Sequence, residues 1–285
     1  MDDRLRRARA SLRGLAVGDA LGEQVTDARG RVLPPQPWRW TDDTEMACSV
    51  VRVLAAHRGL DTDALAASFV EHHDPDRNYG PGVEAMLRAA GGVPLREQAA
   101  AAFGGSGSWG NGAAMRVAPL GAWFAGDPAT AARAAAESAR VTHTHPEGVA
   151  GAVATAVAAS LAASGAPVGE LYAAVLAHTQ AGEVRDGVET ATTLAEAAPA
   201  DAAAALGTGA RLSAADTVPL ALWVAARHLE DYPEAVWTAA GVAEDTDTVC
   251  AIVGGIVAAR VGAAGVPKQW RSACEPLPEW VITSG

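Results

Sequence analysis

The sequence predicts an all-α fold, with a single compact domain of many helices over residues 1–285. Alanine dominates the composition, whereas Phe and Tyr occur only three times each. Alanine is the strongest helix former, and aromatic and β-branched residues favour strands. Gly and Pro recur at spacings that suit helices of about 10–16 residues, and no linker or block of charge divides the chain. We therefore expect helices throughout.

Apolar periodicity between the Gly and Pro positions places the individual helices. Leu5, Leu12 and Leu15 form one apolar stripe at helical spacing, which predicts the first helix. The full set of predicted helices is 4–20, 44–58, 62–72, 81–90, 113–125, 128–140, 147–164, 168–179, 199–205, 216–229, 233–241 and 248–261.

The last predicted helix contains an unusual pair of glycines. Val249 and Ile256 belong to its apolar stripe, and Gly254 and Gly255 lie between them. Glycine lowers the stability of a helix interior unless another backbone has to approach closely. We therefore expect a tight helix contact at this position.

Charge and cysteine content exclude several classes of protein. The formal net charge is −11, and no basic patch of the kind that binds duplex nucleic acid is visible. We expect no nonspecific nucleic-acid binding, although a small nucleic-acid end stays open as a substrate. Cys48, Cys250 and Cys274 are an odd, widely spaced set, which fits neither a disulfide framework nor a zinc site.

The sequence predicts no membrane segment. Residues 1–14 are charged and lack the apolar core of a signal peptide. No uninterrupted apolar run approaches the roughly 18 residues of a membrane span, and the Ala-rich stretch 149–163 is too short. We expect a soluble, cytoplasmic monomer.

A pair of acids, Asp42 and Asp43, stands just before an apolar helix that begins near Glu45. One interpretation is N-capping, in which a short acid accepts backbone N–H bonds and complements the helix dipole. Capping explains one acid well and explains two adjacent acids, flanked by Thr41 and Thr44, less well. The alternative interpretation is a cation site.

A second acidic motif, EDTDT at 244–248, also precedes an apolar helix. Asp245 and Thr248 have the spacing of a capping box in reverse order. A turn that placed Asp245, Asp247 and Thr248 on one side would instead make an oxygen-rich half-site. Both interpretations remain open for this motif.

Together, the two motifs suggest metal. Four carboxylates brought together would raise one another's pKa unless cations neutralised them. Hard oxygen ligands favour Mg, Mn or Ca over Zn, and two such ions would hold a water and polarise substrate oxygens. Whether the two helix starts meet in space is not readable from the sequence.

A Gly-rich loop, residues 104–112, precedes the helix predicted at 113–125. Glycines permit close backbone approach, and helix N–H groups attract phosphate. Ser108 could donate to a phosphate and Trp109 could stack on a ribose or base. The loop is neither a Walker loop nor a dinucleotide-binding GxGxxG. The alternative is a flexible surface loop.

His143 and His145 are separated by one residue, which is a weak zinc signal without a third ligand nearby. A polar loop or a substrate contact explains them better. Trp38 and Trp40 are expected to pack in the core or in a loop, and Arg116 is expected to pack or cap.

Five motifs in this order resemble the ADP-ribosylglycohydrolase family, which includes the dinitrogenase reductase-activating glycohydrolase and ADP-ribosyl-arginine and ADP-ribosyl-serine hydrolases. Each motif is modest alone, but the ordered set is specific and spans most of the chain. The motifs are GLAVGDALG at 14–22, WTDDTEMA at 40–47, GNGAAMRVAPLG at 110–121, THTHPEGVAGA at 142–152 and EDTDTVCAIVGG at 244–255.

The resemblance implies a compact all-α hydrolase with two divalent cations, Mg or Mn, with Ca as a further option. It implies cleavage of the N- or O-glycosidic bond at C1″ of an ADP-ribose conjugate, on a protein or a small molecule. Asp43 or Asp245 would orient the attacking water. The implied metal ligands are Thr41, Asp42 and Asp43 on one side and Asp245, Asp247 and Thr248 on the other.

The resemblance also implies a substrate site. His143 matches a position close to the diphosphate or ribose. The residues that match the family's phosphate- and ribose-binding loop are Gly107, Ser108, Trp109, Gly110 and Asn111.

The sequence departs from the family pattern near both acidic motifs. Many members carry Gly-Gly before the second motif, where this chain has Ala243 and Glu244. Many carry an assisting Glu about four residues after the GDALG glycine, where this chain has Thr26. Glu23 is our candidate for that acid, although Asp27 is close by.

Two other functions remain as alternatives. One is a non-catalytic ADP-ribose-binding or structural protein, like the crystallin relatives of the family, which the full set of six candidate ligands disfavours. The other is a di-metal phosphohydrolase of a nucleotide diphosphate. The leaving group stays open among Arg, Ser, a nucleic-acid end, O-acetyl-ADP-ribose and another small metabolite.

Overall fold

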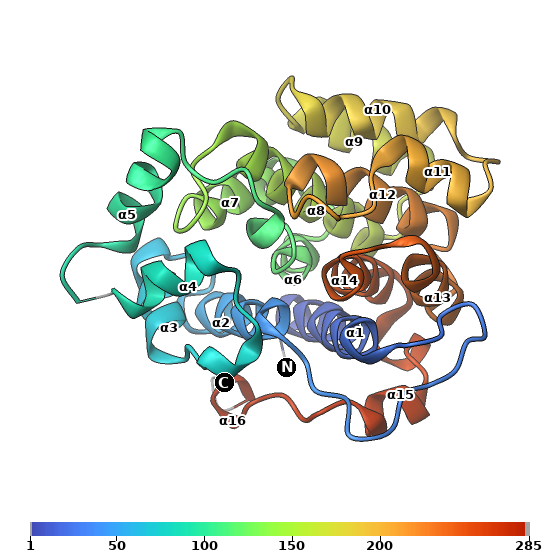
Figure 1. Cartoon of the computed structure of the whole chain (residues 1–285), viewed down its shortest axis with the longest axis horizontal. Coiled ribbons are helices and arrows are strands. Elements are labelled where there is room, and N and C mark those ends of the chain that lie inside the picture. The colour runs from blue at the N-terminus through green and yellow to red at the C-terminus, as the bar shows by residue number, and fades with distance from the viewer. Residues whose placement is uncertain (1, 90, 283–285) are drawn as a thin grey trace.

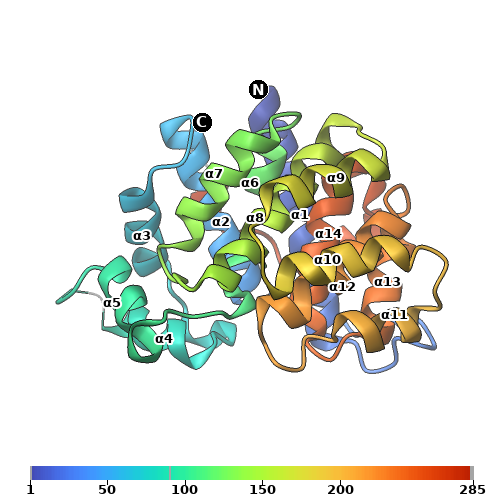
Figure 2. The ribbon, with the colours of Figure 1, turned by 90° about the horizontal axis from the view of Figure 1, so that it is seen from above.

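The computed structural model describes residues 2–89 and 91–282, and helices account for almost all of their regular structure (Figures 1 and 2). No β-sheet forms in these ranges, where strand-like pairing is limited to two isolated bridges, Trp38 with Cys274 and Gly110 with Ser213. The all-α prediction is confirmed.

The sixteen α-helices of the described residues have the following bounds, and the three 3-10 turns η1 (Pro75–Arg77), η2 (Ala102–Gly105) and η3 (Asn111–Ala113) lie among them. They are α1 (Asp3–Gln24), α2 (Asp42–His57), α3 (Thr62–Glu71), α4 (Pro81–Arg88), α5 (Leu95–Ala101), α6 (Ala118–Trp123), α7 (Pro128–Ala139), α8 (Pro146–Ser164), α9 (Val168–His178), α10 (Glu183–Thr193), α11 (Pro199–Leu206), α12 (Ala214–Arg227), α13 (Tyr232–Val242), α14 (Thr246–Gly265), α15 (Lys268–Ala273) and α16 (Glu279–Ile282).

Helices α1 and α14 lie side by side and antiparallel at the centre of the fold (Figure 1). Glycines of α1 face backbone atoms of α14 along the whole contact. A Cβ atom on Gly18 would lie 2.2 Å from the carbonyl oxygen of Cys250, and one on Gly22 would lie 2.6 Å from that of Thr246. The C-terminal end of α1 is therefore held directly against the N-terminal end of α14.

The expected tight contact at Gly254 and Gly255 is present. A Cβ on Gly254 would lie 2.5 Å from the carbonyl oxygen of Gly14, and one on Gly255 would lie 2.7 Å from the Cβ of Ala118 in α6. The glycines of α14 are thus required by packing, as predicted.

The helix predicted at 113–125 is wrong in its extent. The segment is instead the short turn η3 followed by α6, which begins at Ala118. Pro119 explains the break, because proline lacks an N–H and is accommodated in the first turn of a helix, where the structure places it.

Four helices were not predicted, namely α5, α10, α15 and α16. The longest, α10, buries only Val184, Val188 and Ala191 along one face of an otherwise polar segment. The other three have seven residues or fewer, which is too short for an apolar period to emerge.

Two helices are longer and more apolar than the sequence analysis expected. By length and mean hydropathy, α8 and α14 both meet the requirements of a membrane span. Within the fold, 78% of the most apolar 18-residue stretch of α8 is buried, and 67% of the corresponding stretch of α14. Both helices are core helices of the bundle (Figure 2), and this burial explains why they are apolar on all sides.

Candidate functional site

The two acidic motifs meet where α1, α2 and α14 come together. Asp42 and Asp43 begin α2, and Asp245 and Asp247 flank the start of α14. All four, together with Thr248, line one cavity of about 550 Å³. The structure therefore brings together the two helix starts whose proximity the sequence could not reveal.

A buried acid that the sequence analysis missed, Asp19 of α1, supports the first motif. Its carboxylate accepts hydrogen bonds from the backbone N–H and the hydroxyl of both Thr41 and Thr44, at 2.5–3.1 Å. Thr41 is the N-cap residue of α2 and makes no side-chain capping bond itself. Helix α2 is thus capped from α1, so Asp42 and Asp43 are released from the capping role that one interpretation gave them.

The acids of the first motif are under electrostatic strain. Burial and the neighbouring charges of Asp19 and Asp247 raise the pKa of both Asp42 and Asp43 well above the usual range. Asp43 Oδ2 lies 3.0 Å from the hydroxyl of Thr41. Its other oxygen, Oδ1, is buried and has no hydrogen-bond partner.

The second motif is arranged similarly. Asp245 is the N-cap residue of α14, but its side chain makes no capping bond. One carboxylate oxygen instead accepts a hydrogen bond of 2.6 Å from Asn111 Nδ2. Burial and the charge of Asp247 raise the pKa of Asp245 to about 7, and burial raises that of Asp19 to about 7 as well. Capping is therefore not the role of the paired acids in either motif.

The chemistry of these donors fits hard cations. Among the described residues, no group of three or more His, Cys, Asp or Glu side chains is arranged so that it could hold one metal ion. Nevertheless, the ligand-capable atoms are oxygens, their carboxylates raise one another's pKa, and Asp43 Oδ1 is a buried acceptor without a donor. A divalent cation would remove both the repulsion and the unsatisfied acceptor.

The Gly-rich loop forms another wall of the same cavity and is well anchored. Asn111 N donates to the carbonyl of Leu212 at 3.1 Å, and the carbonyl of Trp109 accepts from Ala214 N at 3.0 Å. Ser108, Trp109, Gly110 and Asn111 all line the cavity. These contacts favour a fixed loop over a flexible surface loop for this part of the segment.

Gly107 does not line the cavity with its neighbours. Its φ of +75° is in the left-handed region, and a Cβ there would lie 2.1 Å from Thr144 Oγ1. Its contribution is close backbone packing that fixes the loop.

Aromatic side chains border the cavity mouth. Trp109 is 44% exposed and packs against Phe103, which is 58% exposed, with ring centroids 4.8 Å apart. Phe103 was missed in the sequence analysis. It stands in an Ala- and Gly-rich segment, and the exposure of a large aromatic ring becomes visible only in the fold.

His143 lies buried beneath the loop and lines the cavity. Its Nδ1 is 2.8 Å from Thr142 Oγ1, and burial together with the nearby Arg116 charge lowers its pKa to about 3. The ring is therefore neutral at ordinary pH. His145 has a separate role, because its Nδ1 accepts the N–H of Glu147 and caps α8.

The predicted packing residues behave as expected. Arg116 is fully buried and donates to the carbonyls of Gly112 at 3.0 Å and Ser138 at 2.9 Å. Trp38 and Trp40 are buried in the hydrophobic core.

The structure distinguishes the two candidate acids at the end of α1, because Glu23 lies in the last turn of the helix and Asp27 lies beyond it. Glu23 is exposed and does not line the main cavity, but partial burial and the nearby charge of Asp247 raise its pKa. Asp27 is exposed and accepts the N–H of Gly30 at 2.7 Å in a turn. Thr26 is also exposed.

The extra acid Glu244 is held away from the cavity wall. Its carboxylate accepts the hydroxyl of Thr208 at 3.0 Å, and its side chain is exposed. It is absent from the cavity lining, so the acid that replaces Gly at this position is not part of the wall.

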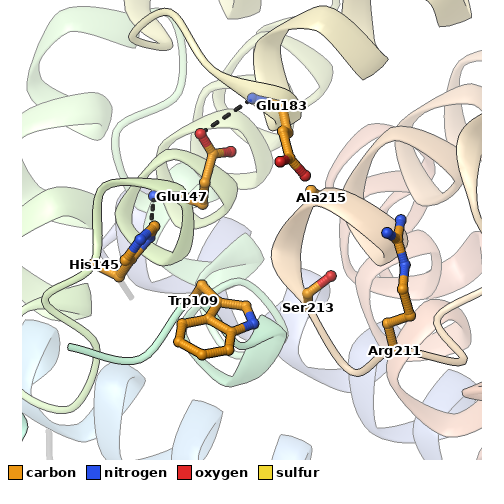
Figure 3. Close-up of a pocket in the computed structure, with 7 residues that line it drawn as sticks. All are labelled: Trp109, His145, Glu147, Glu183, Arg211, Ser213 and Ala215. Carbon is orange, nitrogen blue, oxygen red and sulfur yellow. Dashed lines mark hydrogen bonds between the residues drawn. The ribbon is translucent and has the colours of Figure 1, made fainter. Parts of the chain in front are cut away.

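A smaller cavity of about 290 Å³ lies beside the main one, and Figure 3 shows the residues that line it. Trp109 and Arg211 also line the main cavity. Two charged groups of the smaller cavity are already paired within the protein. The carboxylate of Glu147 accepts the N–H groups of Glu183 and Val184 at 3.1 and 2.8 Å. The guanidinium of Arg211 forms a salt bridge with Asp216 at 3.0 Å. The main cavity, whose four acids form no salt bridge with the described residues, is therefore the candidate site.

Comparison with protein families gives one match over nearly the whole chain. The model of the ADP-ribosylglycohydrolase family matches residues 1–283.

Two relatives are similar over most of their length, and a third over about half. ADP-ribosylhydrolase ARH3 of Bos taurus is 30% identical, with 96% of this chain and 90% of the relative covered. ARH3 of Homo sapiens is 28% identical, with 96% and 91% covered. ADP-ribosyl-[dinitrogen reductase] glycohydrolase of Rhodospirillum rubrum is 31% identical over 49% of this chain and 52% of its own.

A solved structure, described as an ADP-ribosylglycohydrolase-related protein complex, shares the fold. The TM-score is 0.74 at 28% identity, with 100% of this chain and 97% of the other covered.

Proposed function

Because the chain belongs to the ADP-ribosylglycohydrolase family, we propose that it hydrolyses the glycosidic bond between C1″ of ADP-ribose and a leaving group. One observation carries this proposal. The two acidic motifs meet in a single cavity that the Gly-rich loop also lines, so a charged reaction centre and a candidate phosphate-binding loop face the same space.

The cavity suggests how ADP-ribose would lie. The reacting ribose belongs beside the four acids, and the diphosphate belongs beside Ser108 and Gly110 at the loop. Trp109 and Phe103 offer aromatic faces to the base at the cavity mouth. His143 is neutral, so it would meet the phosphates as a hydrogen-bonding group and not as a cation.

We propose that two divalent cations, Mg or Mn, occupy the acidic end. When bound, they would neutralise the carboxylates and polarise ribose hydroxyls and a water molecule. Because the acids alone do not enclose an ion, Thr oxygens, water and substrate would complete the coordination, as Mg often requires. The proposed protein ligands are Thr41, Asp42, Asp43, Asp245, Asp247 and Thr248.

The protein's own groups would handle the proton. In hydrolysis, the bond from C1″ to the leaving group breaks, the oxygen of water bonds to C1″, and a proton of water passes to the leaving group. Asp43 or Asp245 is our candidate to orient the water. Glu23 is our candidate to protonate the leaving group, because its raised pKa suits a general acid.

A substrate panel tests the proposed reaction. Proteins and small molecules that carry ADP-ribose on Arg, Ser, a nucleic-acid end or acetate are incubated with Mg or Mn, and the products are identified by mass spectrometry. We expect free ADP-ribose from at least one of them. Release of AMP and ribose phosphate would point to a phosphohydrolase instead, and binding of ADP-ribose without any turnover would point to a non-catalytic protein.

Cation binding should depend on pH in a defined direction. Without cations, the folded-state pKa of Asp19 and Asp245 is about 7, against about 3.9 in an unfolded chain. Between those values the folded state binds more protons, so these two groups lower the free energy of unfolding as pH rises. A bound cation stabilises the ionised carboxylates and so removes this loss in the free energy of unfolding. Protons compete less with cations at higher pH, so cation binding is tighter there.

We therefore expect the stabilisation by saturating Mg, measured by urea unfolding with Mg and with EDTA, to be larger at pH 7.5 than at pH 5.5. Histidine titrations that are the same in both conditions cancel in this difference. Equal stabilisation at both pH values would contradict the prediction.

A further inference from the structure

The side chain of Asn111 joins the Gly-rich loop to the second acidic motif. It is 8% exposed, and its amide nitrogen donates to Asp245 Oδ2 at 2.6 Å and to Thr217 Oγ1 of α12 at 3.0 Å. An Asn amide has only two N–H donors. Both are therefore used inside the protein, and neither is left for a phosphate of the substrate.

The backbones of the Gly-rich loop and of the second acidic motif are both hydrogen-bonded to one segment, residues 207–213. The carbonyl of Thr208 accepts the N–H groups of Glu244 at 2.8 Å and Asp245 at 3.3 Å. The carbonyl of Leu212, in the same segment, accepts Asn111 N at 3.1 Å. The segment thus sets the distance between the loop and the start of α14.

The segment is also closely packed at Asp245. A Cβ on Gly209 would lie 2.4 Å from the Cβ of Asp245, and the φ of Gly209 is +87°. The main chain beneath Asp245 is therefore fixed. What remains free is rotation of its carboxylate, and the hydrogen bond from Asn111 restrains that rotation.

We propose that Asn111 is a positioning residue, which orients the Asp245 carboxylate for cation binding and does not donate a side-chain hydrogen bond to the substrate. This assignment rests on the proposed function. It differs from the substrate-binding role that the sequence resemblance implies for the residue. One oxygen of Asp245 is held by the amide, and the other would be available to bind a cation.

The test compares two variants of the same loop, Asn111→Ala and Ser108→Ala. Calorimetric titration with Mg or Mn, without substrate, gives cation affinity, and titration with ADP-ribose gives ligand affinity. Loss of a residue that orients a metal ligand lowers metal affinity by about 10- to 100-fold. We expect this loss for Asn111→Ala, and for Ser108→Ala we expect unchanged cation affinity with weaker ADP-ribose binding.

A second measurement uses activity. For Asn111→Ala, raising the cation concentration should restore kcat, because the defect is in cation binding. Circular dichroism and thermal unfolding in EDTA check that the variant folds. If it does not, Asn111→Ser, which keeps a shorter donor, should show a smaller loss of cation affinity in the same direction.

The outcomes separate this inference from the proposed function. Wild-type cation affinity in Asn111→Ala, with weakened ADP-ribose binding, would overturn the positioning role and leave the proposed function intact. Failure of the wild-type protein to bind Mg or Mn at all would overturn the proposed cation site, and the positioning role with it.

Discussion

Replacing Asp42 or Asp245 with alanine is expected to lower kcat/KM for an ADP-ribose conjugate by about 10³-fold or more. Metal ions contribute several kcal/mol of transition-state stabilisation, and each 1.4 kcal/mol or so corresponds to tenfold in rate. Each variant removes a proposed ligand from one side of the cluster. The measurement is steady-state hydrolysis at saturating Mg, with cation affinity determined in parallel.

Asp27→Ala is the matched control for these two variants. Asp27 is also an acid near the end of a helix, but it is exposed and bonded within a turn. We expect near wild-type activity, which would also favour Glu23 as the assisting acid. Full activity of both Asp42→Ala and Asp245→Ala would show that the metal-site hypothesis is wrong.

Gly18→Ala is expected to destabilise the protein by about 3 kcal/mol or more. The added Cβ would lie 2.2 Å from the carbonyl oxygen of Cys250, so α1 and α14 would have to separate. Overpacking of a core costs about 1–3 kcal/mol, and a backbone atom is less able to move than a side chain. Urea unfolding gives the change in the free energy of unfolding.

Gly169→Ala provides the control for this substitution. Gly169 also lies in a helix, α9, but a Cβ there would have no neighbour within 4 Å. We expect a change between zero and a gain of about 1 kcal/mol, from the higher helix propensity of alanine. Similar stability of Gly18→Ala and Gly169→Ala would contradict the tight α1–α14 contact.

The sequence predicted the fold well where apolar periodicity was long. The first stripe, with Leu5 and Leu12, correctly placed α1, and the paired glycines of α14 correctly indicated a close helix contact. The prediction was wrong at Pro119, where one expected helix is a turn and a short helix. Short helices such as α15 stayed hidden because their packing partners, and not their own pattern, stabilise them.

The paired acids of the candidate site were predicted from the sequence, but the residues that hydrogen-bond to the two acidic motifs were not predicted in that role. Asp19 lies in the apolar, buried part of α1, residues 14–22, and that single buried charge was the available signal. Its partners Thr41 and Thr44 are more than twenty residues away, so its capping role depends on tertiary structure. The same holds for Asn111, whose partner Asp245 is 134 residues away.

The glycine contact between α1 and α14 ends at the candidate site itself. A Cβ on Gly22 would lie 2.7 Å from the Cα of Asp247, so two main chains touch there with no side chain between them. A contact of this kind has no rotamers through which it could adjust. We expect the spacing of the two acidic motifs to be a fixed dimension of the molecule, and substrate preference to be set by the surrounding loops, which can change without altering it.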